Sequence, residues 1–280
     1  MPDRRAAAPT GPPLAGLIDT HCHLDAAEYA PDRDQVIARG RTAGLIAIVV
    51  PAVAPAGFDD VRQLAHARAD AGIHYALGLH PMAVPTLRDE ALDQLADALV
   101  RHRDDPRLVA VGEIGLDFFV DDPDPGRQER FFDAQLALAA RHDLPVIIHS
   151  RRANDRIAKA LRRRPVSGGI AHAFNGSMVQ AQVMIDLGFR LGFGGVMTFE
   201  RSRRIRQLAC QCPLEALVLE TDGPDLAPAW LAPGRNEPAE LAGIACCLAS
   251  LRGMPVESVV AATTANARAA LPRMGARAPD

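Results

Sequence analysis

Short apolar segments recur along this chain, and most of them are continuous rather than alternating. There are eight, each rich in Val, Ile, Leu or Gly. A continuous apolar run of this length is typical of a β-strand that is covered on both faces of a parallel sheet. The predicted strands are Gly16 to Asp19, Leu45 to Val50, His74 to Leu79, Leu108 to Glu113, Pro145 to His149, Gly169 to His172, Arg190 to Phe193 and Leu217 to Asp222.

The segments between these strands have the spacing of amphipathic helices. Leu92, Leu95 and Leu99, for example, fall at i, i+3 and i+7 and so share one helix face. Strand and helix therefore alternate for most of the chain, and eight such units predict an α/β fold, the (β/α)8 TIM barrel. A doubly wound open sheet is the alternative. The residues from Gly253 onwards predict one extra C-terminal helix.

Composition bounds the domain organisation. The chain has 280 residues, of which 48% are hydrophobic and 23% are charged, as in a globular protein with a sizeable core. Residues 1–13 are rich in Ala, Pro and Arg and lack apolar periodicity, so we expect a disordered tail there and a single domain over 14–280. No apolar stretch is long enough for a secretion signal or a membrane span. We therefore expect a cytoplasmic protein.

The cysteines and the net charge limit the kinds of site and partner that the chain is expected to have. The five cysteines are an odd number and form no Cys-x-x-Cys pair, which argues against a disulfide framework or a zinc ribbon. The formal net charge of −3 gives no overall attraction to nucleic acid, so local arginines must meet any polyanion. The candidates are Arg151 and Arg152, Arg162 to Arg164, and Arg201, Arg203, Arg204 and Arg206.

The carboxyl ends of the predicted strands carry residues that bind metals, and these ends are where a barrel of this kind has its active site. They are His21 and His23 at the first strand, Glu113 at the fourth, His149 at the fifth, His172 at the sixth and Asp222 at the eighth. On a strand, the i and i+2 spacing of His21 and His23 would aim both imidazoles at one point. Each residue alone has a structural explanation. Together they would be buried polar groups without partners, and a divalent ion supplies the partner.

Six ligands exceed the three or four that an ordinary catalytic zinc takes from a protein, so we expect two divalent ions. Glu113 is the expected bridge, with His21, His23 and Asp222 on one ion and His149 and His172 on the other. The nitrogen and oxygen donors suit Zn²⁺, Mn²⁺, Fe²⁺ or Mg²⁺. Asp19 and Glu220 each stand two residues before a ligand, where a carboxylate that supports the ligands is expected.

Beyond the ligands, the chain closely resembles the TatD family of metal-dependent hydrolases, a branch of the amidohydrolase-like barrels. The matching segments are Asp19-Thr-His-Cys-His-Leu-Asp25, Gly78-Leu-His-Pro81, Gly112-Glu-Ile-Gly-Leu-Asp117, Ile148-His-Ser-Arg151, His172-Ala-Phe-Asn-Gly176, Glu220-Thr-Asp-Gly-Pro224, Arg235-Asn-Glu-Pro238 and Thr263-Thr-Ala-Asn266. The resemblance implies a barrel, a two-metal centre on the six residues above, and hydrolysis of phosphoester bonds. Members are described as DNases that act from strand ends.

The sequence departs from the commonest family pattern in a few places. Where many members carry Asp-Ala after the His-Ser-Arg segment, this chain has Arg152-Ala153, which leaves its substrate preference open. Lysine usage is informative as well. Many two-metal relatives bridge their ions with a carbamylated lysine on the fourth strand, but Lys159 is the only lysine here and lies in a predicted helix. Glu113 must therefore be the bridge.

These residues suggest a mechanism in which two ions activate a water molecule and polarise the scissile phosphoester. Asp222, a ligand that also faces the attacking water, is the expected general base, and we count it and Glu113 as catalytic. His80, at the end of the third strand, and Arg151, just past the fifth, are the expected substrate-binding residues on the phosphate. For His80 a structural role is the alternative.

Two other functions remain open at this point. The same metal site suits a carboxylic ester or amide hydrolase, including a D-aminoacyl-tRNA deacylase, because activated water attacks a carbonyl equally well. A barrel that only binds its metal or a partner is the non-enzymatic alternative. For a nuclease, we expect a monomer that takes short single-stranded DNA ends, because one barrel mouth is small and the net charge is slightly negative.

Overall fold

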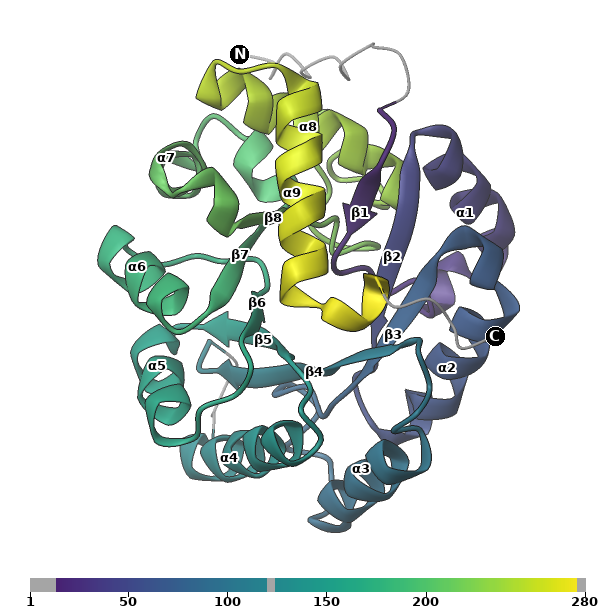
Figure 1. Ribbon diagram of the computed structural model, residues 1–280, viewed down its shortest axis with the longest axis vertical. Coiled ribbons are helices and arrows are strands. Elements are labelled where there is room, and N and C mark those ends of the chain that lie inside the picture. The colour runs from purple at the N-terminus through teal and green to yellow at the C-terminus, as the bar shows by residue number, and fades with distance from the viewer. Residues whose placement is uncertain (1–13, 120–123, 276–280) are drawn as a thin grey trace.

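The computed structural model describes residues 14–119 and 124–275, and it confirms the predicted (β/α)8 barrel (Figure 1). Eight strands pair in the order β1 to β8, and every pair is parallel. The strands are β1 Leu17–Asp19, β2 Leu45–Pro51, β3 Ile73–Leu77, β4 Leu108–Asp117, β5 Val146–Arg151, β6 Gly169–Ala171, β7 Phe189–Phe193 and β8 Leu217–Leu219. The tail predicted for residues 1–13 lies outside the described residues.

Helices alternate with the strands and surround the barrel (Figure 1). They are α1 Arg33–Thr42, α2 Phe58–Ala67, α3 Glu90–Arg101, α4 Pro125–Arg141, α5 Asn154–Arg163, α6 Met178–Asp186, α7 Arg203–Gln211, α8 Leu241–Arg252 and α9 Val256–Ala270. Short 3₁₀ helices span Ala27–Tyr29, Pro55–Gly57, Ala69–Ala71, Gly195–Thr198, Leu214–Ala216, Pro238–Glu240 and Pro272–Gly275. Among the described residues, no single helix is long and apolar enough to cross a membrane, although Pro238–Arg252 and Val256–Ala270, bent by 110°, pass that test as a pair.

The extra C-terminal helix α9 covers the amino-terminal end of the barrel. Asn266 donates to the carbonyl of Leu217, the first residue of β8, and Thr264 donates to the carbonyl of Gly16, just before β1. The last turn of α9 belongs to the same apolar cluster as side chains from seven strands, among them Ile18, Val49 and Ile147. The helix therefore seals one end of the barrel and leaves the carboxyl ends of the strands for the site.

The barrel closes between β1 and β8 through the residues that follow these strands rather than through a regular ladder. The amide and the hydroxyl of Thr20 both donate to the carbonyl of Leu219, at 3.1 and 3.0 Å. The buried Asp19 carboxylate accepts the amide of Thr221 at 3.0 Å and its hydroxyl at 2.6 Å, and it also accepts the amide of His21 at 3.2 Å. These hydrogen bonds fix the position of both chain segments that carry ligands at this seam.

A histidine on β3 should make the stability of the fold depend on pH. Burial and the neighbouring Arg107 lower the pKa of His74 to about 4, and its Nδ1 is buried without a hydrogen-bond partner among the described residues. Because the folded protein prefers the neutral ring, the stability is fully present above the ordinary pKa of 6.5 and is lost as pH falls from there towards 4. The loss can reach about 3 kcal/mol.

Urea unfolding of the wild type and of His74→Gln between pH 7 and pH 4 tests this prediction. We expect the wild type to lose more free energy of unfolding than the variant across this range, because the variant has no ring to protonate. Parallel pH profiles of the two proteins would contradict the assignment of this loss to His74.

Candidate metal centre

The six predicted ligands all lie at the carboxyl end of the barrel, and four of them form a first group. The Nε2 atoms of His21 and His23 are 3.3 Å apart. Oε2 of Glu113 lies 3.2 Å from the His21 nitrogen and 3.6 Å from the His23 nitrogen. Oδ1 of Asp222 lies 3.7 and 3.9 Å from the same two nitrogens.

The placement of His21 and His23 differs from the prediction in one respect. Strand β1 ends at Asp19, so both histidines lie in the loop after the strand, and the alternation of a strand does not aim them. The backbone of this loop is instead held by the residues that follow β8: the amide of Asp222 donates to the carbonyl of His21, and the amide of His23 donates to the carbonyl of Gly223, both at 2.8 Å. The two imidazoles converge because of this pairing.

A second group surrounds the other oxygen of Glu113. Oε1 of Glu113 lies 3.0 Å from Nδ1 of His149 and 3.4 Å from Nε2 of His80. The other ring nitrogen of His149 contacts Oδ2 of Asp117 at 3.0 Å. We did not assign Asp117 from the sequence because the predicted strand ended at Glu113, whereas β4 continues to Asp117 and carries it four residues further along the strand. Asp117 is the last residue of the family motif Gly112 to Asp117, and its place in that motif could have identified it as a site residue.

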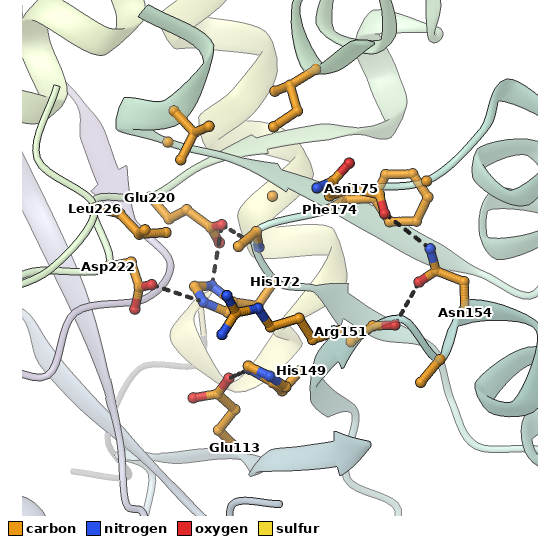
Figure 2. Close-up of a pocket in the computed structure, with 18 of the residues that line it drawn as sticks. Glu113, His149, Arg151, Asn154, His172, Phe174, Asn175, Glu220, Asp222 and Leu226 are labelled. Atoms are coloured by element: carbon orange, nitrogen blue, oxygen red, sulfur yellow. Dashed lines mark hydrogen bonds and ion pairs between the residues drawn. The ribbon is translucent and has the colours of Figure 1, made fainter. Parts of the chain in front are cut away.

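His172 lies between the carboxylates of Asp222 and Glu220 and contacts both (Figure 2). Its ring stacks on that of His21 with centroids 3.5 Å apart, and its Nε2 is 3.4 Å from Oδ2 of Asp222. Its Nδ1 is 3.1 Å from Oε1 of Glu220, which also accepts the amide of Ala173 at 2.6 Å. Glu220 therefore contacts a predicted ligand, His172, which follows another strand. Gly192 permits this, because a Cβ there would meet Glu220 at 2.2 Å.

His80 is oriented by its own loop. The amide of Met82 donates to Nδ1 of His80 at 3.1 Å, so in the neutral ring the proton is on Nε2, the atom that faces the site. A protonated nitrogen is a hydrogen-bond donor and offers no lone pair to a metal ion. His80 differs in this respect from His149, whose Nε2 is engaged by Asp117 and whose Nδ1 is left for the site.

The charges of the site suit a divalent cation. Burial alone would raise the pKa of Glu113, but the imidazoles of His80 and His21 outweigh it and hold that pKa well below its ordinary value. Burial lowers the pKa of His21, which favours the neutral ring that coordinates a metal. At His149 and His172, by contrast, nearby carboxylates outweigh burial: they raise the pKa of His149 to about 9 and that of His172 well above its ordinary value, so a bound cation would displace protons from these two rings. Two sets made up of predicted ligands, His21 with Glu113 and His172 and His21 with His23 and Asp222, have ligand atoms within 4.8 Å of one another, so the residues present fit a divalent metal ion.

The side chains of the predicted ligands face a cavity of about 1260 Å³. The loops that follow most of the strands line this cavity. Arg151 and Arg152 lie on one side, with their guanidinium carbons 4.0 and 4.3 Å from the ring centroid of Phe119. Backbone strain gathers here as well. Of five described non-glycine residues with positive φ, four line this cavity: Arg152, Ala173, Asp222 and Leu226. Strained backbone of this kind is characteristic of functional sites.

Fold and site together define a class of protein. A (β/α)8 barrel with imidazoles and carboxylates converging at the carboxyl ends of its strands is the architecture of a metal-dependent hydrolase. A model of the family described as "TatD related DNase" matches residues 18–272. The chain belongs to the TatD family, as its motifs predicted.

Two relatives and one solved structure show the extent of the similarity. YjjV of Escherichia coli K12, an uncharacterized metal-dependent hydrolase, is 40% identical over 254 residues, which are 90% of this chain and 96% of YjjV. The 3′-5′ ssDNA/RNA exonuclease TatD of Klebsiella pneumoniae is 35% identical over 260 residues, again 90% of this chain and 96% of the relative. The crystal structure of Escherichia coli YjjV matches with a TM-score of 0.87 and 38% identity, and it covers 92% of this chain and 99% of its own.

Removing the charge of Glu220 should weaken metal binding. Glu220→Gln takes a carboxylate away from Nδ1 of His172, and loss of such a supporting partner lowers metal affinity by about 10–100-fold. Competition of the purified protein with a chromophoric chelator for Zn²⁺ measures this affinity. Glu215→Gln is the matched control, because Glu215 is exposed and lies just before the same strand. Equal affinity of the Glu220→Gln variant and the wild type would contradict the supporting role.

Proposed function

We propose that this protein is a two-metal hydrolase of phosphodiester bonds, namely a deoxyribonuclease that acts at the ends of single-stranded DNA. The main observation in favour of this proposal is the position of the Glu113 carboxylate. Its Oε2 faces His21 and His23, and its Oε1 faces His149 at 3.0 Å. A carboxylate with one oxygen towards each of two groups of ligands is what a bridge between two ions requires.

The proposed ligand sets are those expected from the sequence. His21, His23 and Asp222 would hold one ion, His149 and His172 would hold the other, and Glu113 would join them. Zn²⁺, Mg²⁺ and Mn²⁺ are the candidate ions for such nitrogen and oxygen donors. When bound, they lower the pKa of coordinated water and polarise the bond under attack. All of these ligands come from one chain, so the proposal needs no second copy of the protein.

Asp222 is the proposed general base. Burial alone would raise its pKa, but His172 and His21 hold the pKa of Asp222 below its ordinary value, so the carboxylate is ionised near neutral pH. Its side chain remains 17% exposed and lines the cavity, whereas that of Glu113 is 2% exposed. Asp222 is therefore the carboxylate that a water molecule in the cavity can reach, and it can accept the proton of that water.

His80 and Arg151 are the proposed phosphate-binding residues. The proton on Nε2 of His80 points towards the site, where it can be donated to a phosphate oxygen. Arg151 follows His149 by two residues on β5 and lines the cavity. An imidazole N–H and a guanidinium provide charge-assisted hydrogen bonds to the non-bridging oxygens of a phosphodiester.

Nucleic acid as the substrate has two supports. The relative from Klebsiella pneumoniae is named as a 3′-5′ exonuclease of single-stranded DNA and RNA. In addition, one side of the cavity is cationic: Arg151, Arg152, Arg156 and Arg204 line it. A net charge of −3 leaves this local patch as the feature that attracts a polyanion.

Replacement of the proposed base tests the mechanism. Asp222→Asn should lower hydrolysis of bis(p-nitrophenyl) phosphate by at least about a hundredfold, because the amide can neither accept the proton nor bind the ion as a carboxylate does. Circular dichroism should show an intact fold. Asp93→Asn, the same change at an exposed position on α3, is the control and should retain full activity.

Two results would contradict the proposal. One is full activity of a folded Asp222→Asn variant. The other is a wild type that, supplied with Zn²⁺, Mg²⁺ or Mn²⁺, releases the amino acid from D-aminoacyl-tRNA but does not shorten an end-labelled oligonucleotide. The second result would establish the carboxylic ester hydrolase in place of the nuclease.

A further inference from the structure

Two consecutive arginines in the cavity lie against one exposed aromatic ring. The guanidinium carbon of Arg151 is 4.0 Å and that of Arg152 is 4.3 Å from the centroid of Phe119. The arginines come from the end of β5 and the phenylalanine from the loop after β4. All three residues line the cavity of the proposed active site.

We propose that Phe119 and Arg152 form a subsite for the nucleotide next to the scissile bond, in which Arg152 binds a second phosphate of the strand and Phe119 stacks on a base. This inference rests on the proposed function and names the substrate that the site selects. The ligand is an oligonucleotide with at least one phosphate beyond the one that is hydrolysed.

A second cluster of two arginines around a phenylalanine ring lies elsewhere in the chain, and there the ring is buried and the arginines are ion-paired. Arg127 and Arg130 lie 4.8 and 5.9 Å from the centroid of Phe131, but both arginines form ion pairs with Asp89 and the ring is completely buried. That cluster is structural, since its charges are neutralised and its ring is part of the core.

The cluster in the cavity lacks these features. Arg151 and Arg152 form no ion pair within residues 14–119 and 124–275, and Phe119 is 47% exposed. Arg156, the next arginine along the chain, is paired with Glu129 in the usual way. An exposed ring beside guanidinium groups that form no ion pair with the described residues offers aromatic surface to a base and charge to a phosphate, the combination that proteins use to hold single-stranded nucleic acid.

The backbone conformation of Arg152 differs from that of an ordinary surface residue. Its φ is 57°, in the left-handed region that costs a non-glycine residue free energy. Strain of this kind persists where the surrounding structure holds it, and here it lies in the lining of the cavity, where the charge of Arg152 can attract a phosphate.

The size of the cavity also favours a substrate longer than its scissile group. About 1260 Å³ exceeds the roughly 300–1,000 Å³ of pockets that hold one small ligand. The metal ligands occupy the barrel end of this space, and Phe119 and Arg152 belong to the loops around it. A second nucleotide fills volume that a single phosphodiester leaves to water.

The test compares three thymidine dinucleotides: the unphosphorylated form, the form with a 5′-phosphate and the form with a 3′-phosphate. We expect the wild type to cleave at least one phosphorylated form with a kcat/KM about tenfold or more above that of the unphosphorylated form, as a charge-assisted contact allows. Arg152→Asn should reduce this ratio to near one. Asparagine is chosen because it tolerates the left-handed backbone and removes the guanidinium group with its charge.

Two further variants accompany it. Phe119→Leu keeps an apolar side chain but removes the ring, and it should reduce the same ratio. Arg101→Ala removes one exposed positive charge from α3 outside the cavity, and it should keep the ratio of the wild type. The ratio separates the subsite from general damage, because a folding defect lowers the kcat/KM of all three dinucleotides together.

The outcomes distinguish the subsite from the function on which it rests. Hydrolysis by the wild type with no preference for either phosphorylated form would overturn the subsite and leave the nuclease in place. A preference that persists in Arg152→Asn would also overturn it. If the wild type with Zn²⁺, Mg²⁺ or Mn²⁺ cleaves none of the three dinucleotides, the proposed function itself fails, and the subsite fails with it.

Discussion

The seam between β1 and β8 is the constraint on which both the barrel and its site depend. A sheet of eight parallel strands must join its first strand to its last, and here the junction is made by Asp19, Thr20 and Thr221. The same hydrogen bonds place His21 beside Asp222. Burial raises the pKa of Asp19 to about 7, since its carboxylate has given up water for these contacts. The contacts that close the barrel therefore also place His21 beside Asp222, and helix α9 seals the opposite end of the barrel.

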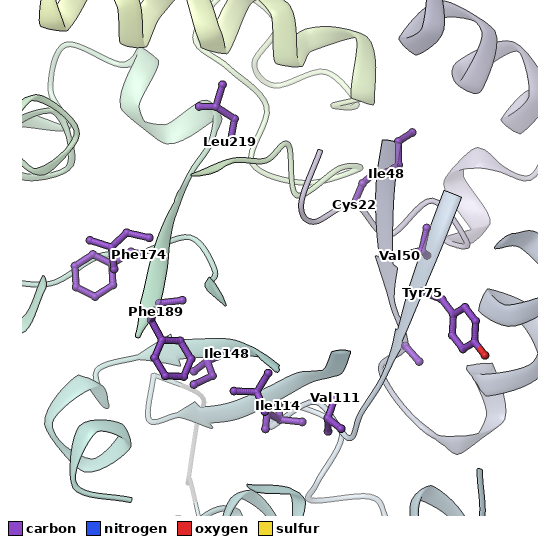
Figure 3. Packing of buried hydrophobic residues seen from close by; sticks show 14 of the residues in the cluster. Cys22, Ile48, Val50, Tyr75, Val111, Ile114, Ile148, Phe174, Phe189 and Leu219 are labelled. Atoms are coloured by element: carbon purple, nitrogen blue, oxygen red, sulfur yellow. The ribbon is translucent and has the colours of Figure 1, made fainter. Parts of the chain in front are cut away.

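Most of the fold could be predicted because burial on both faces leaves a simple pattern in the sequence. Along β2 and β3, alternate residues belong to two different apolar clusters. Ile48, Val50 and Tyr75 belong to the larger one (Figure 3), and Val49 and Ala76 to the one inside the barrel. A strand with apolar residues on both faces reads as a continuous apolar run. The residues that interrupt these runs at one end are then visible as candidate ligands, which is why six of them could be listed in advance.

What could not be predicted depends on contacts between residues far apart in the chain. The predicted first strand ends at Asp19, as β1 does, but nothing in the residue pattern indicates that backbone pairing with Gly223 turns His23 towards the site. The part played by Asp117 follows from the added length of β4, and the donor role of His80 from the amide of Met82. Arg152 shows the same limit for the substrate, because its left-handed backbone and its contact with Phe119 belong to the folded loop. The candidate metal ligands can therefore be predicted from residue types. The positions of these side chains and the specificity for substrate depend on the folded backbone.

The central claim is that Glu113 joins two metal ions, one towards His21 and His23 and the other towards His149. Anomalous diffraction at the metal edge from crystals grown with Zn²⁺ or Mn²⁺ tests it most directly, because each ion appears as a separate peak whose neighbours can be identified. We expect two peaks per chain, with the Glu113 carboxylate between them and one of its oxygens towards each. A single peak, or two peaks of which only one has Glu113 beside it, would contradict it.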